Sequence, residues 1–116
     1  MPDMLSELQA LIADRKQNPK PGSYTNRLLD EGIPKIAQKV GEEAVEVIVA
    51  SLSQTRDLQI GEISDLFYHT LVLMAHQGIT LDDVYAELAR RHSITHTLKE
   101  QRDQKAAAEA QDDLHG

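Results

Sequence analysis

The sequence predicts an all-α fold, built as an antiparallel helical bundle. Apolar residues recur at helical spacing in successive segments, and clusters of proline, glycine and polar residues separate these segments. Aromatic residues make up only 3% of the 116 residues, whereas aliphatic residues are plentiful, as in the core of a helical bundle. A chain of this length can form one domain with its own core.

The first two helices are predicted on either side of a proline-rich break. Apolar residues stand at helical spacing in residues 6–16, and the run NPKPG that follows ends this helix. Ser23 then caps a short helix through Glu31. Gly32 ends that helix at the point where a left-handed residue is needed.

Three longer helices are predicted in the rest of the chain. Pro34 suits the first turn of a helix over residues 34–53. The next helix spans about residues 58–77 and stops at a glycine. Thr80 caps a further helix, which is predicted to end near His92.

The domain organisation follows from where the apolar pattern stops. We expect residues 1–92 to form one all-α domain, and residues 93–116 to form a polar tail that is partly helical or disordered. Several helices are apolar on more than one face, which suggests that a partner chain covers the surplus.

Composition excludes several classes of function. The chain has no cysteine, so disulfides, thiolate metal sites and cysteine nucleophiles are excluded. No apolar run reaches membrane-spanning length and no signal peptide is recognisable, so we expect a cytoplasmic protein with no membrane partner. The net charge of -7 argues against nucleic-acid binding, but a divalent metal would still allow a small phosphate ligand.

Acidic residues form two lines on neighbouring predicted helices. At about 100° per residue, one arc of the helix over residues 34–53 carries five charged side chains, while the rest is mostly apolar. These are Lys35, Lys39, Glu42, Glu43 and Glu46. This helix is therefore predicted to be mostly buried, with one charged stripe. Glu62, Asp65 and His69 form the second line, on the next helix.

The two lines are predicted to face each other. A short break joins the helices, so they should run antiparallel, with Glu46 roughly level with Glu62. Four or five carboxylates in one groove repel strongly without a cation, and oxygen ligands favour Mg²⁺, with Mn²⁺ as a substitute. Since Mg²⁺ commonly bridges to substrate phosphates, the pattern indicates hydrolysis or transfer at a phosphate.

Other interpretations of the same residues stay open. Each acidic stripe could be a solvated face, in which Lys39 and Glu43 form an i, i+4 pair. His69 is a ligand, a proton carrier or a hydrogen-bonded core residue. Arg90 and Arg91 either hold phosphates or interact with the C-terminal end of their helix.

Three short runs make the chain recognisable: SYT at residues 23–25, KVGEE at 39–43 and DLFYH at 65–69. Two adjacent glutamates, a third glutamate three residues later and Glu-x-x-Asp on the next helix accompany these runs. Together they resemble the phosphoribosyl-ATP pyrophosphatases of the all-α nucleoside triphosphate pyrophosphohydrolase superfamily, to which MazG also belongs. The resemblance covers about residues 5–92, whereas the acidic pattern alone indicates only the superfamily.

The resemblance implies a reaction and an assembly. Phosphoribosyl-ATP would be hydrolysed to phosphoribosyl-AMP and pyrophosphate, the second step of histidine biosynthesis, with Mg²⁺ required. The resemblance also implies a homodimer whose helices form a joint bundle.

The resemblance also implies roles for individual residues. Four carboxylates would hold the metal, namely Glu43, Glu46, Glu62 and Asp65. The predicted catalytic residues are Glu42, Glu43 and Lys39. Glu42 would be a further ligand or orient a water, and Lys39 would neutralise phosphate or hold the glutamates in place. The substrate contacts would come from Tyr24, Thr25, Lys35, Lys39 and Arg90.

Two alternative functions remain at this stage. A house-cleaning (deoxy)nucleoside triphosphate pyrophosphatase of the MazG type shares the acidic pattern. A non-catalytic helical dimer that serves as an interaction module is the alternative from a different class, with the polar tail as its binding segment.

Overall fold

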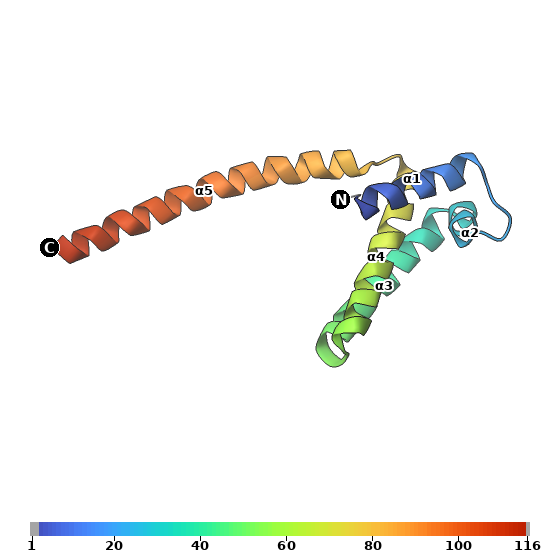
Figure 1. Ribbon diagram of the computed structural model, residues 1–116, viewed down its shortest axis with the longest axis horizontal. Coiled ribbons are helices and arrows are strands. Elements are labelled where there is room, and N and C mark those ends of the chain that lie inside the picture. The colour runs from blue at the N-terminus through green and yellow to red at the C-terminus, as the bar shows by residue number, and fades with distance from the viewer. Residues whose placement is uncertain (1–2, 116) are drawn as a thin grey trace. The chain divides into compact units, whose positions relative to one another are not determined.

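A computed structural model describes residues 3–115, and the side chains of residues 93–98 and 111–115 lie outside that description. Within residues 3–115 the chain forms five α-helices and no strand, so the predicted all-α fold is confirmed (Figure 1). The chain divides after Leu81 into two units. The first unit holds four helices and all of the acidic residues singled out above.

Helix α2 (Tyr24–Glu31) has the ends that the sequence predicts. The side chain of Ser23 accepts a hydrogen bond from the backbone N–H of Asn26, which satisfies one of the free donors at the helix start. Gly32 follows the helix with a φ of 82°, a conformation that residues with a Cβ rarely adopt. These two residues fix where the short helix begins and ends.

Helices α3 (Ile33–Ser53) and α4 (Arg56–Gln77) form the antiparallel hairpin that the sequence predicts (Figure 1). Two residues, Gln54 and Thr55, join them, and the side chain of Thr55 caps α4. The two helices pack against each other more extensively than any other pair. Their packing determines which side chains meet between them.

Helix α1 (Met4–Gln17) packs against α4 and closes the core of the first unit. The ammonium group of Lys16 donates to the carbonyl of Ala75 on α4 (2.9 Å). The large apolar side chains that are fully buried come from all four helices, and they are Ile12, Leu28, Ile36 and Val72.

The prediction that the helix over residues 34–53 is mostly buried is wrong for this chain by itself. Only three of its residues are buried, namely Ile36, Glu43 and Ala50. Its outer side exposes Val45, Ile48, Val49 and Leu52. The reason is geometric: the other helices of the unit cover one side of α3, and its apolar residues extend around more than that side.

Helix α5 (Leu81–His115) belongs almost entirely to the second unit. The sequence predicts that this helix ends near His92, but the backbone stays helical to His115. Residues 79–115 contain neither glycine nor proline and are rich in strong helix formers, so nothing stops the helix. The predicted domain boundary between residues 92 and 93 thus lies inside a continuous helix, and the division into domains stays a prediction. None of the helices described is both long and apolar enough to cross a bilayer.

We predict that Ile12→Ala lowers the free energy of unfolding by about 2–5 kcal/mol, because it opens a cavity where α1 meets the core. Its neighbour Leu11 is 46% exposed, so Leu11→Ala is the matched control and should cost less than about 1 kcal/mol. Urea denaturation of the two variants checks this. Equal losses would contradict the assignment of Ile12 to the core.

Candidate active site

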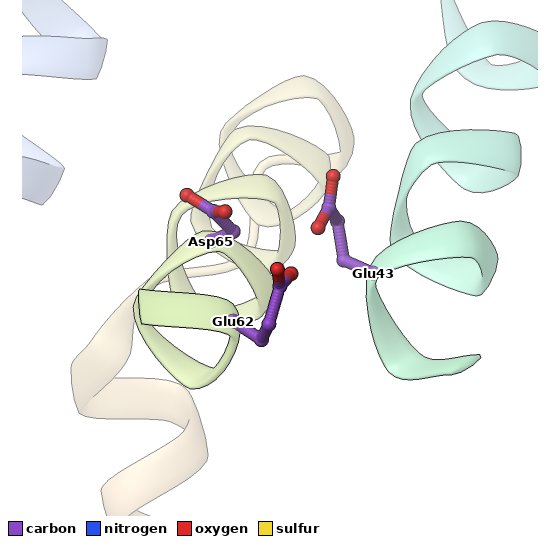
Figure 2. A group of neighbouring side chains, drawn as sticks. All are labelled: Glu43, Glu62 and Asp65. Atoms are coloured by element: carbon purple, nitrogen blue, oxygen red, sulfur yellow. The ribbon is translucent and has the colours of Figure 1, made fainter. Parts of the chain in front are cut away.

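Three carboxylates meet between α3 and α4, which we call the carboxylate cluster: Glu43, Glu62 and Asp65. One oxygen of each lies within 4.8 Å of the others. Figure 2 shows Glu43 on α3 and Glu62 and Asp65 on α4, with the carboxylates of Glu43 and Glu62 directed into the space between the helices. The antiparallel hairpin thus brings together residues about 20 positions apart in the chain.

The carboxylate cluster lacks protein partners for two of its buried oxygens. Oε2 of Glu43 and Oε2 of Glu62 are buried and accept no hydrogen bond from the residues that the structure describes. A buried carboxylate oxygen without a donor is costly, and a cation removes that cost. The oxygens of an Mg²⁺ site lie within roughly 4 Å of one another, so small side-chain rotations would let all three groups bind one ion. The residues present therefore fit a hard divalent cation.

Glu46 lies beside the carboxylate cluster, one turn beyond Glu43 on α3. Its carboxyl is close enough to those of Glu43 and Glu62 to affect both, so the predicted level arrangement of Glu46 and Glu62 is confirmed. Burial and the neighbouring Glu46 carboxyl raise the pKa of Glu43. The Glu46 carboxyl and burial raise the pKa of Glu62. Glu46 itself is exposed and lies outside the group of three.

The geometry separates the two adjacent glutamates. Glu42 is exposed and lies outside the carboxylate cluster, whereas Glu43 is buried within it. Both oxygens of Glu42 are engaged, one by the amide of Gln38 (2.7 Å) and one by the ammonium group of Lys39 (3.4 Å). These hydrogen bonds, with that from Gln38 the stronger influence, lower the pKa of Glu42.

Lys39 joins the two adjacent glutamates. Its ammonium nitrogen lies 3.4 Å from Glu42 and 3.6 Å from Oε1 of Glu43. Partial burial acts to lower the pKa of Lys39, but the hydrogen bond to Glu42 and the nearby charges outweigh it and the pKa is raised. Lys39 therefore stays positively charged at the edge of the carboxylate cluster.

His69 is a hydrogen-bonded core residue that links α2 to the site. Its Nδ1 lies 2.7 Å from the carbonyl oxygen of Asp65, and its Nε2 lies 3.0 Å from the hydroxyl of Tyr24. A carbonyl only accepts, so Nδ1 carries the proton; in the neutral ring Nε2 then accepts from Tyr24. Both ring nitrogens are occupied, which favours the structural role over that of a metal ligand.

The remaining predicted substrate contacts, Thr25 and Arg90, have other partners in the structure. Thr25 is buried, and its hydroxyl is hydrogen-bonded to that of Tyr68, so it ties α2 to α4. Arg90 lies on α5 and pairs with Glu87, which also pairs with Arg91. Arg90 belongs to the second unit, so its role as a substrate contact stays a prediction.

Tyr24, Lys35 and Lys39 meet in a groove of about 340 Å³ between α2 and α3. We call it the basic groove, and its lining is Tyr24, Arg27, Leu28, Glu31, Lys35 and Lys39. Sequence reasoning missed Arg27 as a site residue. The available signal was its position three residues after Tyr24, which places both side chains on one face of a helix.

The sequence matches the family described as phosphoribosyl-ATP pyrophosphohydrolase over residues 5–92. The chain belongs to this family. It is 56% identical over 89 residues to a protein of Sulfurisphaera tokodaii named phosphoribosyl-ATP pyrophosphatase, which covers 77% of this chain and 95% of that protein. A protein of the same name from Clostridium acetobutylicum is 47% identical over 100 residues, covering 86% of this chain and 91% of that one.

The phosphoribosyl-ATP pyrophosphohydrolase match also extends to longer proteins. The histidine biosynthesis bifunctional protein HisIE of Caldanaerobacter subterraneus is 50% identical over 90 residues, which is 78% of this chain and 44% of that protein. The matched region includes every residue of the carboxylate cluster and of the basic groove. The family expected from the three short sequence runs is confirmed.

We predict that metal-free protein loses stability relative to a Glu43→Gln variant as pH rises above 4.5, the ordinary pKa of a glutamate side chain. Because the pKa of Glu43 is raised on folding, the folded chain binds more protons than the unfolded chain between the two pKa values. Stability therefore falls across that window as pH increases.

The measurement is the free energy of unfolding in urea with EDTA, from pH 4 to pH 8, for both proteins. The difference between them reports Glu43 together with the part of the raised Glu62 pKa that the Glu43 charge causes. Both contributions act in the same direction, opposite to that of Glu42, whose pKa is lowered. Parallel pH curves would contradict the raised pKa.

Proposed function

We propose that this chain hydrolyses phosphoribosyl-ATP to phosphoribosyl-AMP and pyrophosphate in the presence of Mg²⁺, as the second step of histidine biosynthesis. Membership of the family supports the reaction. The observation that carries the site is that Oε2 of Glu43 and Oε2 of Glu62 are buried in an acidic cluster and accept no hydrogen bond from the described part of the chain.

The metal ligands that we propose are Glu43, Glu62 and Asp65, with Glu46 beside them as the fourth. Four carboxylates without a cation would repel both one another and the polyanionic substrate. A divalent cation at this position would neutralise the phosphates and polarise the phosphoanhydride, and Mn²⁺ would substitute for Mg²⁺.

Lys39 and Glu42 have linked roles in this proposal. Lys39 supplies positive charge between the carboxylate cluster and the basic groove, where it meets the substrate phosphates. Glu42 holds Lys39 in position, because one of its oxygens accepts from the Lys39 ammonium group while the amide of Gln38 holds the other.

Tyr24 and Lys35 line the groove through which we propose that the substrate reaches the carboxylates. The hydrogen bond to His69 fixes the Tyr24 hydroxyl relative to α4, which preorganises this wall of the site. The reaction adds water across the phosphoanhydride: the bond between phosphorus and the bridging oxygen breaks, and pyrophosphate leaves. No side-chain nucleophile is required.

We also propose that the chain works as a homodimer in the cytoplasm, on a small nucleotide and without nucleic-acid or membrane partners. Besides α3, helix α4 exposes Ile60, Ile63 and Phe67. The hairpin thus presents large apolar side chains on both helices, which is unusual for a monomer. A second copy packed helix against helix would cover them and complete the bundle.

We predict that Glu62→Gln lowers kcat for pyrophosphate release by roughly 100-fold or more, since the metal's charge stabilisation is worth several kcal/mol. Asp57→Asn is the matched control, because Asp57 is an exposed acid in the first turn of the same helix and should leave kcat nearly unchanged. The assay follows pyrophosphate release from phosphoribosyl-ATP with Mg²⁺.

The same three proteins should differ in how far Mg²⁺ raises their melting temperature. Mg²⁺ should raise the melting temperature of the wild type and of Asp57→Asn, but hardly that of Glu62→Gln. Brisk cleavage of deoxynucleoside triphosphates without release from phosphoribosyl-ATP would replace the proposed reaction with the house-cleaning one.

We predict that Ile48→Asp converts the dimer to monomers, because it puts a charge into the apolar face of α3. Sedimentation analysis over a range of concentrations measures the mass. Leu11→Asp places the same charge at an exposed apolar position on α1 and should leave the mass at twice that of the chain. A wild type that sediments at the mass of one chain would refute the dimer.

A further inference from the structure

We propose that Arg27 and Lys35 form an anion subsite in the basic groove and hold a phosphate group of the substrate that the carboxylate cluster does not hold. The inference rests on the proposed function for the identity of the substrate. It adds Arg27 as a residue that contacts the substrate.

The first argument is charge. Neither Arg27 nor Lys35 forms an ion pair with a side chain in the described part of the chain, whereas Lys39 is paired with two glutamates. Glu31 is the one carboxylate in the lining of the groove, so the lining has an excess of positive charge. In a protein with a net charge of -7, such a groove is suited to attract an anion locally.

The second argument is that Arg27 is held in place. Its guanidinium carbon lies 5.2 Å from the centre of the Tyr24 ring, in a cation–π contact. Tyr24 in turn is hydrogen-bonded to the buried His69 (3.0 Å). The side chain therefore loses less freedom when it binds a ligand, and a planar guanidinium suits two-point recognition of phosphate.

The third argument is position. Lys39 lies against Glu43, and Lys35 lies one turn earlier on α3, about 6 Å along the helix axis. The subsite is therefore displaced from the carboxylate cluster by about one turn or more. Phosphoribosyl-ATP carries phosphate in two places, its triphosphate chain and its phosphoribosyl group, and either could supply the phosphate bound here.

A second hollow of about 580 Å³ borders the same two residues, Tyr24 and Arg27. Its charged lining is mixed, with Lys20 and Arg27 against Asp30 and Glu31. Because two positive and two negative side chains line this hollow, it does not favour an anion. We therefore place the phosphate in the basic groove. The mixed lining also makes Lys20 a suitable control, because its removal takes the same charge from the neighbouring hollow.

The test compares Arg27→Ala, Lys35→Ala and the control Lys20→Ala with the wild type. Dissociation constants for phosphoribosyl-ATP and for ATP are measured by calorimetry in EDTA, where no turnover occurs, and KM is measured with Mg²⁺. We expect Arg27→Ala to weaken phosphoribosyl-ATP binding by about 10- to 100-fold, the usual range for a charge-assisted hydrogen bond. Lys20→Ala should bind like the wild type.

The two ligands identify the source of the phosphate. If Arg27→Ala weakens phosphoribosyl-ATP but not ATP, the subsite holds the phosphate of the phosphoribosyl group and selects for it. If both ligands weaken equally, it holds the triphosphate chain. Arg27→Lys should recover part of the affinity, since it keeps the charge but not the planar fork.

Unchanged dissociation constants and KM in both Arg27→Ala and Lys35→Ala would overturn the subsite. So would a loss of affinity accompanied by a lower melting temperature, because that would indicate damage to the packing of Tyr24. Failure of the proposed function is distinguishable: the wild type would then release no pyrophosphate from phosphoribosyl-ATP, while the comparison with ATP would still test the groove.

Discussion

The repulsion between carboxylates on α3 and α4 is the constraint on which the rest of the structure depends. Ile36, Ala50 and Val72 are fully buried, and the packing that buries them also carries Glu43 toward Glu62 and Asp65. The helices cannot exclude water from their apolar residues without bringing these acids together. A bound cation would remove this repulsion and stabilise the folded chain, because it would coordinate oxygens that no donor in the described chain reaches.

Opposite charges lie side by side around Lys39. On one side of it is the carboxylate cluster, and on the other is the basic groove with Arg27 and Lys35. The hydrogen bond between Tyr24 and His69 fixes the position of one region relative to the other, because it connects α2 to the helix that carries Glu62 and Asp65. A substrate with several phosphates could bind both regions, the carboxylate cluster through a metal and the basic groove by direct contact.

The exposed apolar face of the hairpin follows from the small size of the first unit. Four helices bury a few large side chains completely, and the outer sides of α3 and α4 remain uncovered. Small helical units gain stability when a second copy adds to the core. The proposed dimer would thus supply burial that the chain by itself lacks.

The sequence by itself determined the first four helices, the ends of α2 and the acidic lines, because these depend on spacing along one helix and on local turn chemistry. Ser23, Gly32 and Gly78 act within a few residues of where they stand. The level arrangement of Glu46 and Glu62 also followed, since a short connection makes two successive helices run antiparallel. Tertiary packing alone decided that Glu43 is buried while Glu42 is not, and that Thr25 faces Tyr68. Tertiary packing also decided that Arg27 completes a groove with Lys35. Burial and contacts between helices depend on how each helix is rotated against its neighbours, and the periodicity of a sequence does not specify that rotation.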